Sequence, residues 1–221
     1  MVRERPELID RFVLRAVVQP PEKACPVLFH QRGEMRLGPE RRWMPFTAEQ
    51  RMRSDRTAFV WHARFKMAPL VTAVVEDAFE DGKGRLDAKV WGLVPVAHAR
   101  GPKVDRGEAQ RYLAELPWCP LALWENPELR FRQLDARTVR VWVFDEATSM
   151  DLVFDDAGDI VRAHTDARCR DETSEPWGGE FGEYREFGAI RAPSSGHVAW
   201  RSPEGDFEYW RGEILDLDFE C

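Results

Sequence analysis

The sequence predicts a mainly β protein of the α+β class, in which a curved antiparallel sheet or half-barrel of about eleven strands wraps around a mid-chain helix. Three observations predict this class. Segments of alternating apolar and polar residues recur along most of the 221 residues. Short turns join most of these segments, which makes neighbouring strands antiparallel. One long helical pattern interrupts them near the middle of the chain. Such a sheet must curl, close or be covered to hide its apolar face. We find no linker or internal repeat, so we expect a single domain over residues 1–221.

The mid-chain helix is predicted over residues 105–116. Asp105 and Glu108 have the spacing of a capping box, which predicts the start of the helix. Pro117 predicts its end, because a proline disfavours helical geometry in the preceding residue. One face of this helix collects apolar side chains at helical spacing, namely Ala109, Tyr112, Leu113 and Leu116. This face could fill the open side of a curved sheet.

Two further helices and the first strand are predicted near the N-terminus. Residues 6–18 carry apolar side chains at helical spacing and form the first helix, and residues 27–37 form the first strand. Thr47 and Gln50 have the spacing of a second capping box, which predicts a short helix that ends near Arg53.

The other strands follow from alternation and from turn residues. Asp81 and Gly82 predict a tight hairpin turn between two of them. Residues 172–179 are polar, and we expect them to form a loop. The predicted strands cover residues 58–67, 70–79 and 85–96 before the central helix, and residues 129–134, 138–144, 150–154, 160–168, 181–187, 190–200 and 207–219 after it.

Charge and hydropathy exclude several classes of protein. The formal net charge is −7, which argues against a nucleic-acid binder. No run approaches the roughly 18 consecutive apolar residues of a membrane span. The N-terminal residues carry charges throughout and have no apolar signal core, so we expect a cytoplasmic protein.

The cysteines and histidines predict neither a metal site nor a cofactor site. The four cysteines, at positions 25, 119, 169 and 221, are scattered and include no C-x-x-C pair. Two disulfides are arithmetically possible, but a domain of this size does not need them, and we expect reduced, mostly buried thiols. The five histidines have no spacing typical of a zinc or iron site. No phosphate-binding glycine motif occurs.

Candidate site residues come from the central helix and from the aromatic side chains. Arg111 lies between Glu108 and Glu115 at helical spacing, and this cluster could hold a polar ligand group or simply brace the helix. His62 could act as a base, or it could be a solvated residue on a polar strand face. Several aromatic residues could line an apolar pocket or belong to the core, among them Tyr112, Trp118, Tyr184 and Tyr209.

Two sequence blocks carry a family resemblance. Residues 111–118 read RYLAELPW and residues 209–212 read YWRG, and together with other matching stretches they span nearly the whole chain from about residue 28. The chain resembles a family of bacterial proteins known only as a domain of unknown function. This resemblance implies a fold like the incomplete barrel of the lipoprotein carriers LolA and LolB and of the violacein-biosynthesis enzyme VioE. It implies no activity.

Our leading hypothesis is that the protein binds a hydrophobic or aromatic small molecule between the sheet and the 105–116 helix. Arg111 and Glu115 would orient a polar end of the ligand, and Tyr112 and Trp118 would form a wall. We keep two alternatives, and whether the protein is an enzyme stays open. One is a cofactor-independent enzyme in the manner of VioE, with Glu115, Tyr112 or His62 as acid or base. The other is an interaction module with a filled core.

Overall fold

The computed structural model describes residues 5–170 and 173–221, and most of these residues lie in strands. The strands before the central helix are β1 (Val27–Met35), β2 (Met44–Met52), β3 (Phe59–Ala68), β4 (Val71–Glu80), β5 (Lys83–Val90) and β6 (Val94–Ala99). The strands after it are β7 (Arg130–Gln133), β8 (Thr138–Trp142), β9 (Ser149–Phe154), β10 (Ile160–Arg170), β11 (Thr173–Phe181), β12 (Tyr184–Phe187), β13 (Ile190–Pro193), β14 (Ser195–Trp200) and β15 (Phe207–Phe219).

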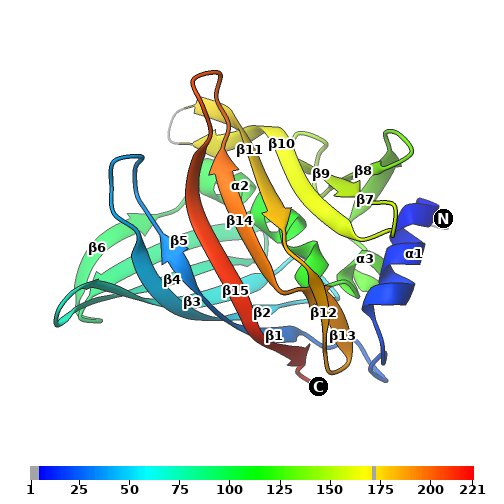
Figure 1. Ribbon diagram of the computed structural model, residues 1–221, viewed down its shortest axis with the longest axis horizontal. Coiled ribbons are helices and arrows are strands. Elements are labelled where there is room, and N and C mark those ends of the chain that lie inside the picture. The colour runs from blue at the N-terminus through cyan, green and yellow to red at the C-terminus, as the bar shows by residue number, and fades with distance from the viewer. Residues whose placement is uncertain (1–4, 171–172) are drawn as a thin grey trace.

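Thirteen of the described strands form one antiparallel sheet, in the order β6-β5-β4-β3-β2-β1-β15-β14-β11-β10-β9-β8-β7. β12 and β13 form a separate hairpin. The edge strands β6 and β7 do not pair with each other, so the sheet stays open. The ribbon in Figure 1 shows the sheet bent around a central helix. The predicted curved antiparallel half-barrel is therefore confirmed.

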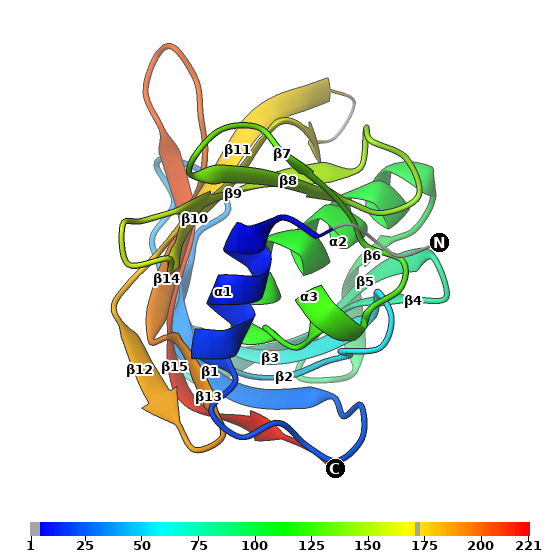
Figure 2. The ribbon, with the colours of Figure 1, turned by 90° about the vertical axis from the view of Figure 1, so that its right-hand side faces the viewer.

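The central helix lies inside the curve of the sheet, and the N-terminal helix lies at one end of it, as Figure 1 and Figure 2 show together. The helices are α1 (Glu7–Ala16), α2 (Pro102–Ala114), the 3-10 turn η1 (Leu116–Trp118) and α3 (Ala122–Glu125). α2 contacts β4 and β5 from the N-terminal half of the chain and β8, β9 and β10 from the C-terminal half. It therefore links the two halves of the half-barrel across the concave face.

The buried face of α2 is the one predicted from the sequence, but the start of the helix is different. Tyr112 and Leu113 are fully buried. The helix begins at Pro102, one turn before Asp105, so the predicted capping box is wrong. The Asp105 carboxylate instead accepts hydrogen bonds from the backbone N–H of Gly84 at 2.8 Å and from Lys83 Nζ at 3.1 Å. These contacts dock the helix on the β4–β5 turn.

The short helix predicted after Thr47 is wrong, because these residues belong to β2. Phe46, Ala48 and Gln50 are buried while the residues between them are exposed, which is the period of a strand. β2 lies between β1 and β3 and pairs with both. The capping-box spacing is a local signal, and pairing on both sides outweighs it.

Residues 173–179 belong to β11, so the predicted loop over 172–179 is wrong there, and Glu172 lies outside the described residues. Trp177 explains the difference, because it is buried and pairs with Thr165 on one side and Trp200 on the other. The residues around Trp177 are mostly polar, so the sequence did not indicate that this tryptophan faces inward.

Two predicted strands are in fact pairs of strands, which raises the number above eleven. The 85–96 segment turns at Trp91 and Gly92, whose φ angles are 52° and 70°. The 190–200 segment divides into β13 and β14. The predicted hairpin turn between β4 and β5 is confirmed, with positive φ angles of 49° at Asp81 and 75° at Gly82.

The cysteine prediction is wrong for two of the four residues. Cys25 and Cys221 form a disulfide, whereas Cys119 and Cys169 are free. The disulfide extends the pairing of β1 with β15, in which Val27 is opposite Phe219. Composition could not reveal this bond, because the two cysteines are brought together by strands from opposite ends of the chain. Within residues 5–170 and 173–221, no helix has the length and apolar character needed to cross a membrane.

Candidate binding cavity

A cavity of about 780 Å³ lies between the concave face of the sheet and α2. Its walls come from both halves of the chain. They are largely apolar, with side chains such as Met44, Phe65, Val75, Leu86, Trp200 and Trp210. Leu37 and Val96 also line it and are 76% and 58% exposed, so they lie at its mouth. The sheet and α2 thus enclose an apolar space that opens to solvent on one side.

Four of the predicted site residues line this cavity: Arg111, Glu115, Trp118 and Tyr209. The indole N–H of Trp118 donates to the Pro193 carbonyl at 2.9 Å. The Tyr209 hydroxyl accepts from Trp177 Nε1 at 2.9 Å. The Trp118 N–H is therefore used within the protein, whereas the Tyr209 hydroxyl keeps its own hydrogen as a donor.

Arg111 donates a hydrogen bond from each of its three guanidinium nitrogens. Its Nε donates to Glu115 Oε1 at 2.8 Å, as the four-residue spacing predicted, and its Nη1 donates to Asp77 Oδ2. Its Nη2 donates to Gln50 Oε1 at 3.2 Å, and the Gln50 amide in turn donates to Glu115. The guanidinium carbon also lies 4.9 Å from the ring centroids of both Phe59 and Trp61. Arg111 therefore fastens α2 to β2 and β4.

Asp77 and Glu108 form a carboxyl pair beside this cluster. Asp77 lines the cavity, and its Oδ1 is buried without a hydrogen-bond partner among the described residues, as is Glu108 Oε2. Burial and the neighbouring Asp77 carboxylate raise the pKa of Glu108 to about 8. At neutral pH the Glu108 carboxyl is thus protonated, and as a neutral acid it can donate a hydrogen bond to Asp77.

The Glu108→Gln variant is expected to flatten the dependence of stability on pH. The folded protein retains a proton on Glu108 between its ordinary pKa of 4.5 and about 8, whereas the unfolded chain releases it. Wild-type stability therefore falls as pH rises through this window, by at most about 1.4 kcal/mol per pH unit from this group. Glutamine keeps a donor toward Asp77 and cannot ionise. Melting temperatures at pH values across the window measure the difference between variant and wild type.

The matched control for this prediction is Glu204→Gln, at an exposed turn position. Its melting temperature should follow the wild-type curve at every pH. An unchanged pH slope in Glu108→Gln would show that Glu108 ionises normally in the folded protein.

Tyr112 does not form a wall of the cavity, contrary to the hypothesis from the sequence. It is fully buried on the side of α2 that faces away from the cavity lining. Its hydroxyl donates to the Arg53 carbonyl at 2.9 Å and accepts from the Asn126 amide at 3.1 Å. Burial raises the pKa of this hydroxyl well above its usual range. Tyr112 is thus a core residue with a satisfied hydroxyl.

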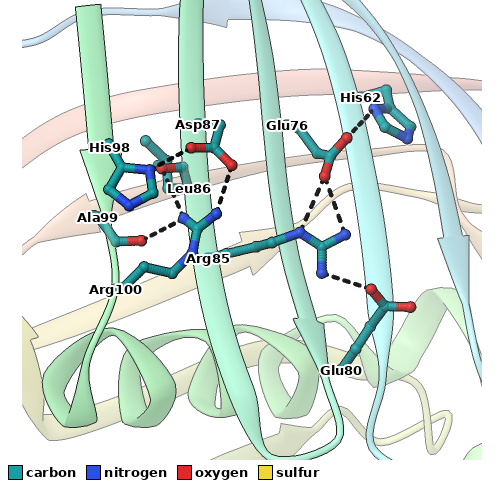
Figure 3. A network of polar contacts seen from close by, with 9 residues as sticks. All are labelled: His62, Glu76, Glu80, Arg85, Leu86, Asp87, His98, Ala99 and Arg100. Carbon is teal, nitrogen blue, oxygen red and sulfur yellow. Dashed lines mark hydrogen bonds and ion pairs between the residues drawn. The ribbon is translucent and has the colours of Figure 1, made fainter. Parts of the chain in front are cut away.

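His62 and Tyr184 also lie outside the cavity. Side chains alternate along β3, so Trp61 points into the cavity and His62 points out to solvent. The His62 side chain is 52% exposed and its Nδ1 lies 3.5 Å from Glu76 Oε2. Figure 3 shows it in a polar network on the face of the sheet that is turned away from α2. The Tyr184 hydroxyl donates to the Ile160 carbonyl at 2.8 Å.

Asp77, Gln50 and Arg168 are site residues that the sequence analysis missed. Asp77 had a detectable signal, because it alternates with Val75 and Phe79 on the inward face of its strand, where a charge is unexpected. Gln50 was assigned to a helix that does not exist. Arg168 gave no usable signal, for the reason described below. Within the described parts of the chain, no group of three or more His, Cys, Asp or Glu residues is placed to hold a metal ion.

Comparisons with solved structures find the same fold in proteins of very different sequence. A domain assigned to outer membrane lipoprotein sorting in Vibrio parahaemolyticus has a TM-score of 0.54 at 11% identity, covering 97% of this chain and 92% of that one. A LolA superfamily protein from Nitrosomonas europaea scores 0.50 at 8% identity, covering 97% and 93%. A DUF1329 family protein from Desulfovibrio piger also scores 0.50 at 8% identity, covering 97% and 91%.

These likenesses establish a LolA-like fold and nothing beyond the fold. The LolA-like architecture implied by the sequence resemblance is therefore confirmed. A sequence comparison with curated proteins finds no match. At the level of sequence families, the model of one family of unknown function, DUF6920, matches residues 3–219.

Proposed function

This chain belongs to the DUF6920 family of unknown function, and from that premise we propose that it binds a hydrophobic or aromatic small molecule between the sheet and α2. The observation that carries the proposal is the cavity of about 780 Å³ with largely apolar walls. Cavities of about 300–1,000 Å³ with a few placed polar groups are typical of small-molecule sites. The Vibrio domain of similar fold is named for outer membrane lipoprotein sorting, and by analogy of fold this name supports an apolar ligand.

The Ala88→Trp variant tests this proposal. Ala88 lies on β5 and lines the cavity, so an indole there occupies space that the ligand needs. We expect affinity for a neutral naphthylamine dye, whose fluorescence rises in apolar surroundings, to fall by about tenfold or more, which corresponds to about 1.4 kcal/mol. Titration of the dye into purified protein measures this change.

Lys89→Trp is the matched control, because Lys89 is the next residue on β5 and is exposed. It adds the same ring outside the cavity, so dye binding should be unchanged. Native mass spectrometry of the wild type complements the titration by detecting a ligand carried through purification. Absence of dye binding to the wild type, or equal loss in both variants, would contradict the proposal.

Each alternative function has one observation in its favour. The proton held by Glu108 beside the cavity-lining Asp77 favours a cofactor-independent enzyme. The exposed apolar side chains of Leu70 and Leu93, at the tips of two hairpins, favour an interaction module. A ligand recovered in chemically altered form after incubation would support the enzyme. Binding of a partner protein to the hairpin tips, without dye binding in the cavity, would support the interaction module.

A further inference from the structure

Arg168 is a buried cation in the wall of the cavity. It lies near the end of β10, lines the cavity and is only 9% exposed. A bulge places it there. β10 advances three residues from Thr165 to Arg168 while β11 advances two from Trp177 to Glu175. The extra residue reverses the alternation, so Arg168 points to the same side of the sheet as Thr165. Simple alternation would turn it away.

The guanidinium of Arg168 has no acceptor among the described residues. Its Nη1 is buried and without a hydrogen-bond partner, and no described carboxylate forms a salt bridge with it. Its Cζ lies 4.5 Å from the ring centroid of Trp177, which also lines the cavity. The ring fixes the position of the cation but accepts no conventional hydrogen bond from it.

Two other partly buried arginines, Arg140 and Arg191, each have a carboxylate partner. Arg140 donates two hydrogen bonds to Asp151, both of 2.7 Å, and Arg191 does the same to Asp159. Arg111 has the three acceptors described above. A buried guanidinium without a counter-ion is costly, because burial removes its hydration without replacing it. Arg168 has no such carboxylate partner among the described residues, so an anion bound in the cavity would stabilise it.

The Glu108 carboxyl does not supply that anion. Glu108 interacts electrostatically with Arg168, but burial raises its pKa to about 8, so it is protonated near neutral pH. Asp77 and Glu115 are both bonded to Arg111. The buried Nη1 of Arg168 is thus left without a carboxylate acceptor among the described residues.

We propose that the ligand of this cavity is an amphiphile with a single carboxylate head group, which Arg168 binds while the apolar tail lies along the aromatic and aliphatic walls. This inference rests on the ligand-binding function proposed above and specifies its ligand class. A monoanion matches one unpaired guanidinium, and planar carboxylates fit its donor geometry. A doubly charged head group would place excess negative charge close to Asp77 and Glu115, which line the same cavity.

The test compares oleate with methyl oleate, which has the same tail and no charge. Each is titrated against the bound naphthylamine dye near neutral pH. The wild type should bind oleate at least about tenfold more tightly than methyl oleate, since a hydrogen bond to a charged group contributes that much or more. Arg168→Gln should lose this preference and keep its affinity for methyl oleate within about twofold. Arg168→Lys retains the charge and should keep part of the preference.

Arg162→Gln is the matched control, because Arg162 is an exposed arginine on the same strand. It should leave both affinities unchanged. Equal binding of oleate and methyl oleate by the wild type would overturn the head-group assignment while leaving the proposed function intact. So would tighter binding of oleoyl lysophosphatidate than of oleate. If neither lipid nor the dye binds to the wild type, the proposed function itself fails.

Discussion

Replacing Arg111 with methionine is expected to lower the free energy of unfolding by about 3–5 kcal/mol, because it leaves two buried carboxylates without their counter-ion. The side chains of Asp77 and Glu115 are only 9% and 15% exposed, and both are bonded to Arg111. The substitution also removes the cation that lies 4.9 Å from the ring centroids of both Phe59 and Trp61. For a chain of this size, the melting temperature should fall by roughly 6–20 °C. Urea unfolding followed by circular dichroism measures the loss of stability.

A second arginine provides the control for this effect. Arg32 forms a salt bridge with Glu213, but the two side chains are 63% and 56% exposed. Arg32→Met should therefore change stability by less than about 0.5 kcal/mol. Arg111→Lys keeps the charge but lacks the planar guanidinium that reaches three acceptors, so its loss of stability should be intermediate. Equal effects of Arg111→Met and Arg32→Met would show that the Arg111 cluster is hydrated in solution.

The central helix could be predicted because its signal is local. Ala109, Tyr112, Leu113 and Leu116 are three or four residues apart, and all four are fully buried in the structure. The same reasoning failed at Thr47, where a capping-box spacing lies in a strand paired on both sides. A local motif decides the structure only where long-range pairing does not compete with it.

In the candidate site, too, contacts set by local spacing could be predicted and contacts set by long-range strand pairing could not. The contact between Arg111 and Glu115 follows from a four-residue helical spacing and could be predicted. Asp77 and Gln50 come from strands that approach α2 only in the folded sheet, so their roles could not be derived from spacing. Arg168 depended on one extra residue in β10 opposite β11. Because a single-residue shift exchanges the two faces of a strand, no alternation pattern could have assigned it to the cavity.

Reducing the Cys25–Cys221 disulfide is expected to lower the free energy of unfolding by about 2–5 kcal/mol. The bond joins residues 196 apart in the sequence, so it removes much of the freedom of the unfolded chain. The folded state should change little, because the backbone N–H of Glu220 still donates to the Pro26 carbonyl at 2.9 Å beside the bond. Urea unfolding with and without a phosphine reductant measures the effect, and Cys25→Ser should reproduce it in the absence of reductant.

Cys169 supplies the control, since it is free and partly exposed. Cys169→Ser should keep both the wild-type stability and the sensitivity to reductant. Alkylation of the unfolded, unreduced wild type should modify Cys119 and Cys169 and spare the bonded pair. Modification of all four cysteines would contradict the disulfide and agree with the cytoplasmic location expected from the sequence. A protected pair would place folding in an oxidising compartment, because structural disulfides persist there and are rare in the cytosol.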